Sequence, residues 1–355
     1  MLNKIMRQPF GTLPDGREVY EFTLTNSKGV SVGILNYGAI IRCIRTPNRH
    51  GYFSDITLGY DDLQSYLNDT SKMGAVVGRF ANRIAGGIIQ MDDKAFQLDQ
   101  NEGLNCLHGG SAGFNSVLWN ASIDSKAPIS QLKLQHVSPD GDQGFPGALN
   151  IQITYTLKDS NELIIDFEAS SDKKTVVSLT MHPYFNLSDD HKSTIGDHLL
   201  TIRADKYLPL KPDLIPTGGK TSVENTAFDF RLEKLIGHGL GMNDEQLKIA
   251  AGYDHCFVVN KQSDWSKPMA AVYHADSGRT LEVFSNAPGI QMYSSNFLSE
   301  SVSGRGGMRF KKHNAVCLEP QEFPNAPNEP SFPSALLNPE EIYKHTISFK
   351  FGIQE

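Results

Sequence analysis

The feature that most constrains the fold is the alternation of apolar and polar residues with a period of two. It is clearest at Ile151, Ile153, Tyr155 and Leu157, which polar residues separate, and it returns between residues 347 and 351. Successive side chains of a β-strand point to opposite faces of its sheet, so this pattern is typical of strands with one buried face. The sequence therefore predicts antiparallel sheets, whose strands commonly bury one face and expose the other.

Other short apolar runs also indicate strands, because Gly, Pro, Asn or Asp residues bound them. These runs lie at residues 30–35, 163–167, 175–181, 199–202, 256–259 and 281–284. Helical periodicity is nearly absent. The main candidate is residues 61–67, where an Asp start and the spacing of Leu63 and Leu67 favour a short helix.

Many strands without intervening helices predict an all-β fold, in the form of a large antiparallel β-sandwich with very little helix. We find no internal repeat, low-complexity tract or linker in the chain. A single domain over residues 1–355 is therefore expected.

Charge and composition exclude several classes of partner. The 355 residues include 33 Lys and Arg against 40 Asp and Glu, which gives a formal net charge of −7, and no basic block occurs. Nucleic acid is not an expected partner, because phosphate binding requires a basic surface. No apolar stretch is long enough for a membrane span or a secretory signal, so we expect a cytoplasmic protein that does not bind membranes, as a monomer or homodimer.

The four cysteines, Cys43, Cys106, Cys256 and Cys317, lie far apart and form no CxxC pair. In a reducing compartment such residues are typically free thiols that pack as small apolar side chains. We therefore expect neither disulfides nor a cysteine metal site.

Six polar-rich segments interrupt the predicted strands. They are GRFANRI (78–84), NCLHGG (105–110), MHPYFNLSD (181–189), GYDHCFV (252–258), GIQMYSSNFL (289–298) and CLEPQEFPNAPN (317–328). Each is ordinary when taken singly: Arg83 can be a surface cation and Asp254 a capping group. Together they offer a carboxylate in an apolar strand, Glu319, and an imidazole beside aromatic residues, His182, which are a candidate base and acid.

These segments resemble, in the same order, those of the aldose 1-epimerase (galactose mutarotase) family. The resemblance implies the galactose mutarotase-like supersandwich, with an aldose in an open cleft across one sheet and with no cofactor or metal. It implies that Glu319 is the general base and His182 the general acid in the interconversion of the α and β anomers of a hexose such as galactose or glucose. The substrate-binding residues that it implies are Asn82, Arg83, His108, Tyr184, Asp254 and Gln291.

The chain departs from the family pattern at Asn325, where an Asp is usual after the proline, and at Ser294 and Ser295, where Thr and Gly are more common. Asn325 keeps the hydrogen-bonding capacity that a turn requires but loses a charge. We expect these differences to affect loop details rather than the acid–base pair.

Anomerisation removes a proton from the C1 hydroxyl and gives one to the ring oxygen, so it needs a positioned base and a positioned acid. At rest, we expect a deprotonated Glu319 and a protonated His182. No GxGxxG strand–helix signature and no P-loop occur, which fits proton transfer without a nucleotide. His182, His191 and His198 have spacings that suit no common metal motif, and the last two are expected in loops.

Three alternatives remain open. A hexose-6-phosphate 1-epimerase would need a cationic pocket, for which Arg79 and Arg83 are candidates. A non-catalytic carbohydrate-binding β-sandwich would need no apposed Glu and His. Finally, Glu322 is a rival for the base: on a strand it lies on the opposite face from Glu319, unless the chain turns at Pro320.

Overall fold

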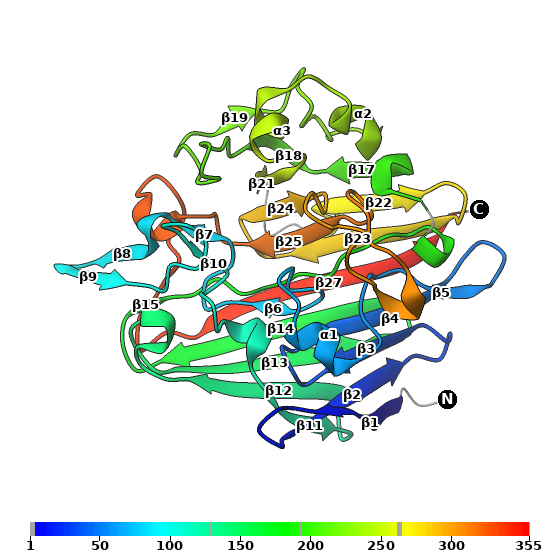
Figure 1. The fold of residues 1–355 in the computed structure, drawn as a ribbon, viewed down its shortest axis with the longest axis horizontal. Helices are drawn as coiled ribbons and strands as arrows, with labels where there is room; N and C mark the ends of the chain where they lie inside the picture. The colour runs from blue at the N-terminus through cyan, green and yellow to red at the C-terminus, as the bar shows by residue number, and fades with distance from the viewer. Residues whose placement is uncertain (1–3, 128, 192, 261–264, 355) are drawn as a thin grey trace.

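The computed structural model describes residues 4–127, 129–191, 193–260 and 265–354. In these ranges the fold consists of antiparallel sheets with three short helices (Figure 1). The largest sheet has nine strands in the order β11 (Asn120–Asp124), β12 (Gln131–Ser138), β13 (Leu149–Leu157), β14 (Glu162–Ser171), β27 (Tyr343–Ile353), β23 (Arg279–Ser285), β22 (Ala270–His274), β17 (His198–Ile202) and β20 (Lys234–Leu235).

Two five-stranded sheets accompany it. The N-terminal one is formed by β1 (Lys4–Thr12), β2 (Glu18–Thr25), β3 (Ser31–Leu35), β4 (Ile41–Pro47) and β5 (Phe53–Asp55). The other has the order β19 (Thr221–Ser222), β18 (Ala204–Tyr207), β21 (Asp254–Val259), β24 (Gly289–Tyr293) and β25 (Cys317–Gln321). Four small pairs complete the described strands: β7 (Arg83–Ile84) with β10 (Cys106–Leu107), β6 (Val76–Val77) with β16 (Thr180–Met181), β15 (Thr175–Val176) with β26 (Leu336–Leu337), and β8 (Ile88–Met91) with β9 (Lys94–Gln97).

One apolar core joins the three large sheets. Phe22 of β2, Ile153 of β13 and Ile290 of β24 belong to the same cluster and are at most 3% exposed. The long strands β12, β13, β14 and β27 run side by side across the molecule, and β24 and β25 lie above them in the view of Figure 1. This sandwich confirms the predicted all-β class.

Most predicted strands are present. The alternating segments at 151–157 and 347–351 fall within β13 and β27, where their apolar residues are buried. The run at 175–181 is not one strand, which corrects the prediction. It divides into β15 and β16, which pair with different partners, because Ser178 between them bridges to Phe80 instead.

The expected short helix is α1 (Leu63–Leu67), whose N-cap is Asp62. The Asp62 carboxylate accepts a hydrogen bond from the Ser65 N–H, as an N-terminal cap does. Sequence periodicity missed α2 (Ile236–Leu240) and α3 (Glu245–Ile249). All three are five residues long, and among the described residues no helix has the length and apolarity that a membrane crossing requires.

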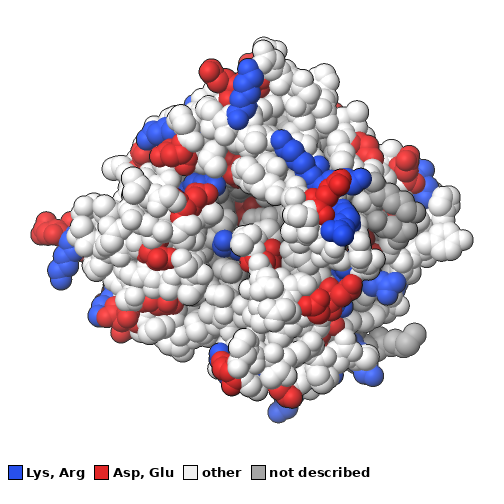
Figure 2. All heavy atoms as spheres, in the orientation of Figure 1, with Lys and Arg blue, Asp and Glu red and all other residues white. Residues whose placement is uncertain are grey.

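The four cysteines are free and buried, as predicted. Acidic and basic side chains are interspersed over the face shown in Figure 2, and a recess opens near its centre, in front of β24 and β25.

Candidate active site

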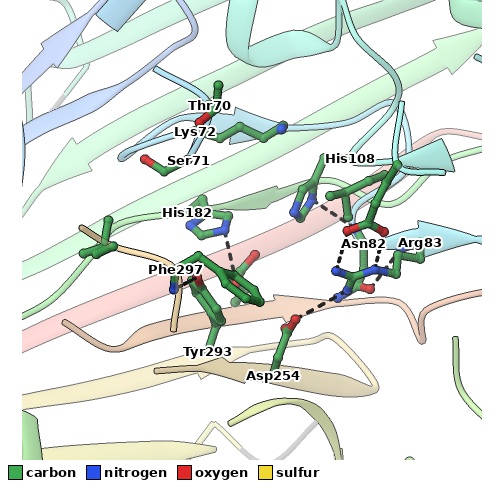
Figure 3. Close-up of a pocket in the computed structure, with 14 residues that line it drawn as sticks. Thr70, Ser71, Lys72, Asn82, Arg83, His108, His182, Asp254, Tyr293 and Phe297 are labelled. Atoms are coloured by element: carbon green, nitrogen blue, oxygen red, sulfur yellow. Dashed lines mark hydrogen bonds and ion pairs between the residues drawn. The ribbon is translucent and has the colours of Figure 1, made fainter. Parts of the chain in front are cut away.

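A cavity of about 200 Å³ gathers residues from all six polar-rich segments. Strands and tight loops position them, so residues far apart in sequence face one another (Figure 3). The lining consists of Thr70, Ser71, Lys72, Asn82, Arg83, Glu102, Leu107, His108, His182, Asp254, Tyr293, Phe297, Leu298 and Glu319.

Glu319 lies in the middle of β25, opposite Gln291 of β24. The strand continues through Pro320, which pairs with Ile290, so the chain does not turn there. Glu319 is 1% exposed, and its Oε2 has no hydrogen-bond partner among the described residues. Burial raises the pKa of this carboxyl well above its usual value, Asp254 adds to the rise, and Arg83 opposes it.

His182 directly follows β16, and its backbone is fixed by two hydrogen bonds. Its N–H donates to the Ala75 carbonyl, and its carbonyl accepts from the Gly74 N–H. The Tyr184 ring stacks on the imidazole with centroids 5.0 Å apart. His182 Nε2 lies 3.7 Å from Glu319 Oε1, so the two groups face each other at the cavity wall.

The pKa shifts of this pair run against the charge state expected from the sequence. Burial lowers the pKa of His182 to about 3, with a further decrease from Lys72, while the pKa of Glu319 is raised. Both shifts come mainly from burial, which disfavours the charged form of each group. Their directions favour a protonated Glu319 and a neutral His182, which is the reverse of the arrangement expected from the sequence.

Arg83 holds two carboxylates at one end of the cavity. Its Nε and Nη2 donate to Glu102 at 2.6 and 2.8 Å, and its Nη1 lies 3.5 Å from Asp254 Oδ2. Asp254 Oδ1 accepts a hydrogen bond of 2.6 Å from Gln291 Nε2. Such a bidentate network fixes the orientation of each group, and it leaves Arg83 paired with Glu102 and Asp254 rather than with Glu319.

Two hydrogen bonds hold Asn82 and His108 together, one to the imidazole ring and one between backbone groups. The Asn82 N–H donates to His108 Nδ1 at 3.2 Å, and the His108 N–H donates to the Asn82 carbonyl at 3.0 Å. Since Nδ1 is an acceptor, the proton of the neutral ring is on Nε2. Burial, with Lys72, His182 and Arg83, holds the pKa of His108 well below its usual value. His108 thus offers one neutral N–H donor at the cavity.

Six of the eight predicted site residues line the cavity, and two do not. Tyr184 lies behind His182, is 2% exposed, and donates its hydroxyl proton to the Ser71 carbonyl at 3.1 Å. Gln291 lies on β24, between the strands that carry Asp254 and Glu319; it pairs with Glu319 and donates to Asp254. These two positions support cavity residues instead of forming the wall.

Four charged or aromatic residues at the wall are not among the eight predicted site residues: Lys72, Glu102, Tyr293 and Phe297. Tyr293 and Phe297 fall within the segment 289–298, so the motif itself signalled them. Lys72 and Glu102 lie in polar loops without any distinguishing pattern.

Two other candidates lie outside the cavity. Arg79 is buried, and its guanidinium donates to Ser138 and to the carbonyls of Pro146 and Gly147. Glu322 follows the end of β25 and does not line the cavity, although burial raises its pKa to about 7.

A group with metal-ligand chemistry, Asp197, His198 and His274, lies away from the cavity. The prediction that His198 lies in a loop is wrong. It is the first residue of β17 and is fully buried. Its Nε2 accepts the Leu187 N–H at 2.9 Å, so its Nδ1 carries the proton and donates to Asp197 at 2.7 Å. A protonated nitrogen cannot ligate a metal, so the geometry fits a hydrogen-bonded group.

In this β-sandwich, a buried carboxyl faces an imidazole at the wall of a cavity lined by fixed hydrogen-bonding groups. These features define an acid–base enzyme for a small polar substrate. The family model for aldose 1-epimerase matches residues 20–350. The chain belongs to the aldose 1-epimerase family.

Individual relatives agree with this assignment. Galactose mutarotase from Homo sapiens is 42% identical over 349 residues, which are 98% of this chain and 99% of that protein. Aldose 1-epimerase from Escherichia coli (strain K12) is 36% identical over 340 residues, 95% and 96% of the two chains. A solved structure of an aldose epimerase homologue from C. elegans has a TM-score of 0.86 at 28% identity, and covers 99% of this chain and 100% of its own.

Proposed function

We propose that the protein interconverts the α and β anomers of an aldohexose such as galactose or glucose, with Glu319 and His182 as its acid–base pair. The observation that carries this proposal is the buried 3.7 Å approach of His182 Nε2 to Glu319 Oε1 at the cavity wall. Family membership supports the same reaction.

Ring opening breaks the bond between C1 and the ring oxygen. A Glu319 carboxylate takes the proton of the C1 hydroxyl as the carbonyl forms, and a protonated His182 gives its proton to the ring oxygen. Rotation about the C1–C2 bond then presents the other face of the aldehyde. Reclosure runs the transfers in reverse, so neutral His182 takes the proton of the ring hydroxyl and Glu319 returns one to the carbonyl oxygen.

The neutral resting pair fits this cycle. The pair holds one proton both before ring opening, on His182, and after it, on Glu319. The resting state, with the proton on Glu319, is thus the state from which the ring closes. Moving that proton from Glu319 to His182 prepares the pair for ring opening and leaves its net charge unchanged. The site needs no electron or group carrier, because only protons move.

The other wall residues would hold the sugar. The His108 Nε2–H and the Arg83 guanidinium are donors, the Asp254 carboxylate is an acceptor, and Asn82 offers both kinds of group. Phe297 is 66% exposed at the rim and presents an apolar ring of the kind that packs on a sugar face.

Polarimetry on freshly dissolved α-D-galactose tests the proposal. We expect the protein to accelerate the approach to anomeric equilibrium and Glu319→Gln to remove the acceleration. A non-catalytic carbohydrate-binding protein would bind the sugar without changing that rate. Equal rates with and without the protein, on galactose and on glucose, would refute the proposal.

The phosphorylated-sugar alternative has less support. Arg79 is committed to backbone carbonyls, and Arg83 is paired with Glu102 and Asp254. Neither guanidinium is therefore available to bind a phosphate bidentately. Faster conversion of glucose 6-phosphate than of glucose would favour the alternative.

We also propose a cytoplasmic protein with one folding domain, acting as a monomer or homodimer. Four free, buried cysteines suit a reducing compartment, and the core shared by the three large sheets suits a single folding unit.

A further inference from the structure

One charged residue at the cavity wall has no role in the mechanism above. Lys72 lines the cavity and extends into it from the loop at residues 70–72, across from Asp254 and Tyr293 in Figure 3. Within the described part of the chain its ammonium has neither a hydrogen bond nor an ion pair, and Asp69 and Glu102 act on it only at longer range. Arg83, in contrast, is paired with two carboxylates.

The loop that carries Lys72 is held on both sides. The Asp69 carboxylate accepts hydrogen bonds from the N–H groups of Ser71 and Met73 at 2.9 and 2.7 Å. The Tyr184 hydroxyl donates to the Ser71 carbonyl, which ties the loop to the residue stacked on His182. Lys72 itself has a φ of +57°, a conformation that few residues other than glycine adopt. These contacts fix the point from which the lysine side chain enters the cavity.

An ammonium group in this position requires an acceptor once a bound sugar displaces the solvent around it. Lysine has three donors and no acceptor, and a buried donor without a partner is costly. Burial already lowers the pKa of Lys72, which shows that the cavity wall removes part of its hydration. A bound sugar would remove more of the hydration of the Lys72 ammonium. The carboxylates of Glu102 and Asp254 already accept hydrogen bonds from Arg83, and Glu102 acts on the ammonium only at longer range. An oxygen of the sugar is therefore the additional acceptor that binding would bring to the ammonium.

We propose that Lys72 is a specificity-determining residue, whose ammonium donates a hydrogen bond to one hydroxyl oxygen of the bound aldose. The inference rests on the proposed function. Its consequence is that the enzyme prefers aldoses that carry a hydroxyl at the carbon facing this loop over analogues deoxygenated there.

The test crosses enzyme variants with sugar analogues. Wild type, Lys72→Met and Lys72→Arg are assayed for kcat/KM on galactose and on its 2-, 3-, 4- and 6-deoxy analogues. Methionine keeps an unbranched chain without the charge. Lys28→Met is the matched control, because Lys28 is exposed in a turn remote from the cavity lining.

We expect Lys72→Met to lower kcat/KM on galactose by roughly 10- to 100-fold, the value of a hydrogen bond to a charged group. The loss should disappear for one deoxy analogue, on which wild type is itself impaired. Lys72→Arg should retain much of the activity, and Lys28→Met should match wild type.

Thermal unfolding midpoints identify any variant that fails to fold. If Lys72→Met unfolds, the comparison of wild type with Lys72→Arg across the same sugars replaces it. Equal losses on every sugar, or no loss on any, would overturn the role of Lys72. Wild type that accelerates no aldose would instead overturn the proposed function, so the two failures are distinguishable.

Discussion

His182 Nε2 lies 3.7 Å from Glu319 Oε1, in surroundings that lower the pKa of the imidazole and raise that of the carboxyl. Both shifts come mainly from burial, so the pair holds one proton between the lowered pKa of His182 and the raised pKa of Glu319, and it titrates as a unit. The same property makes the pair suited to passing one proton to and from a sugar.

Glu319→Gln should nearly abolish turnover while the protein still folds and binds sugar. Glutamine keeps the size of the side chain but is not a base, so the chemical step should slow by roughly 10² to 10⁴. Glu322→Gln is the matched control, since Glu322 is partly buried but does not line the cavity. An active Glu319→Gln, or an inactive Glu322→Gln, would move the base to another residue.

Glu319→Gln should also change the pH dependence of thermal stability, because the pKa of the Glu319 carboxyl is raised in the folded protein. In the folded protein this pKa lies above that of an exposed glutamate. Its contribution to stability is therefore full at acid pH and is lost as the pH rises through the raised pKa. Glutamine does not ionise, so the variant should gain in thermal midpoint relative to wild type as the pH rises. A loss of stability would mean that Glu319 is a structural ion-pair partner.

His182→Asn should lower kcat far more than it changes KM. Asparagine retains a polar side chain of similar reach but cannot deliver a proton, so the lost interaction belongs to the transition state. Steady-state kinetics on galactose, with sugar binding measured separately by calorimetry, distinguishes the two effects. A change confined to KM would make His182 a binding residue.

The sequence identified the strands, their buried faces and most of the predicted site residues, but it did not reveal how deeply the acid–base pair is buried. Ile153 and Phe349 alternate with polar neighbours, so their strands were predictable, and the motif order located Glu319 and His182. Lys72 reaches the cavity only because Asp69 folds its loop, which no local pattern encodes. The charge reversal of the acid–base pair was also unpredictable, since desolvation depends on the whole surrounding fold.

The pH profile should lack an acid limb near the usual histidine pKa. Activity needs one proton on the pair of Glu319 and His182. A second proton binds only near the lowered pKa of His182, which is about 3. We therefore expect kcat/KM to show no decrease as the pH falls through 6.5 to about 5, and to decrease as the pH rises through the raised pKa of Glu319. An acid limb centred near 6.5 would show that His182 titrates as an exposed histidine.

Arg83→Ala should impair both binding and folding. The change leaves Glu102 and Asp254 without their cation, at a cost of about 1–3 kcal/mol in the free energy of unfolding. It also removes a donor from the cavity, so KM should rise roughly 10-fold or more. Arg83→Lys keeps the charge but not the bidentate fork, and an intermediate effect is expected. Wild-type KM values for every aldose in Arg83→Ala would remove Arg83 from the binding site.

Removal of metals should leave activity and stability unchanged. The proposed reaction moves protons only, and the group most similar to a metal site, Asp197, His198 and His274, is organised by hydrogen bonds. Because the Leu187 N–H occupies His198 Nε2, the proton must stay on Nδ1, the atom that faces Asp197. Dialysis against a chelator should therefore preserve both the polarimetric rate and the thermal midpoint, and added zinc should not raise the midpoint. His198→Gln provides the internal check, because it should lower the midpoint with or without the chelator. If the chelator reduced the midpoint of wild type but not of His198→Gln, and zinc restored it, then His198 would be a metal ligand and the tautomer assigned to it would be wrong.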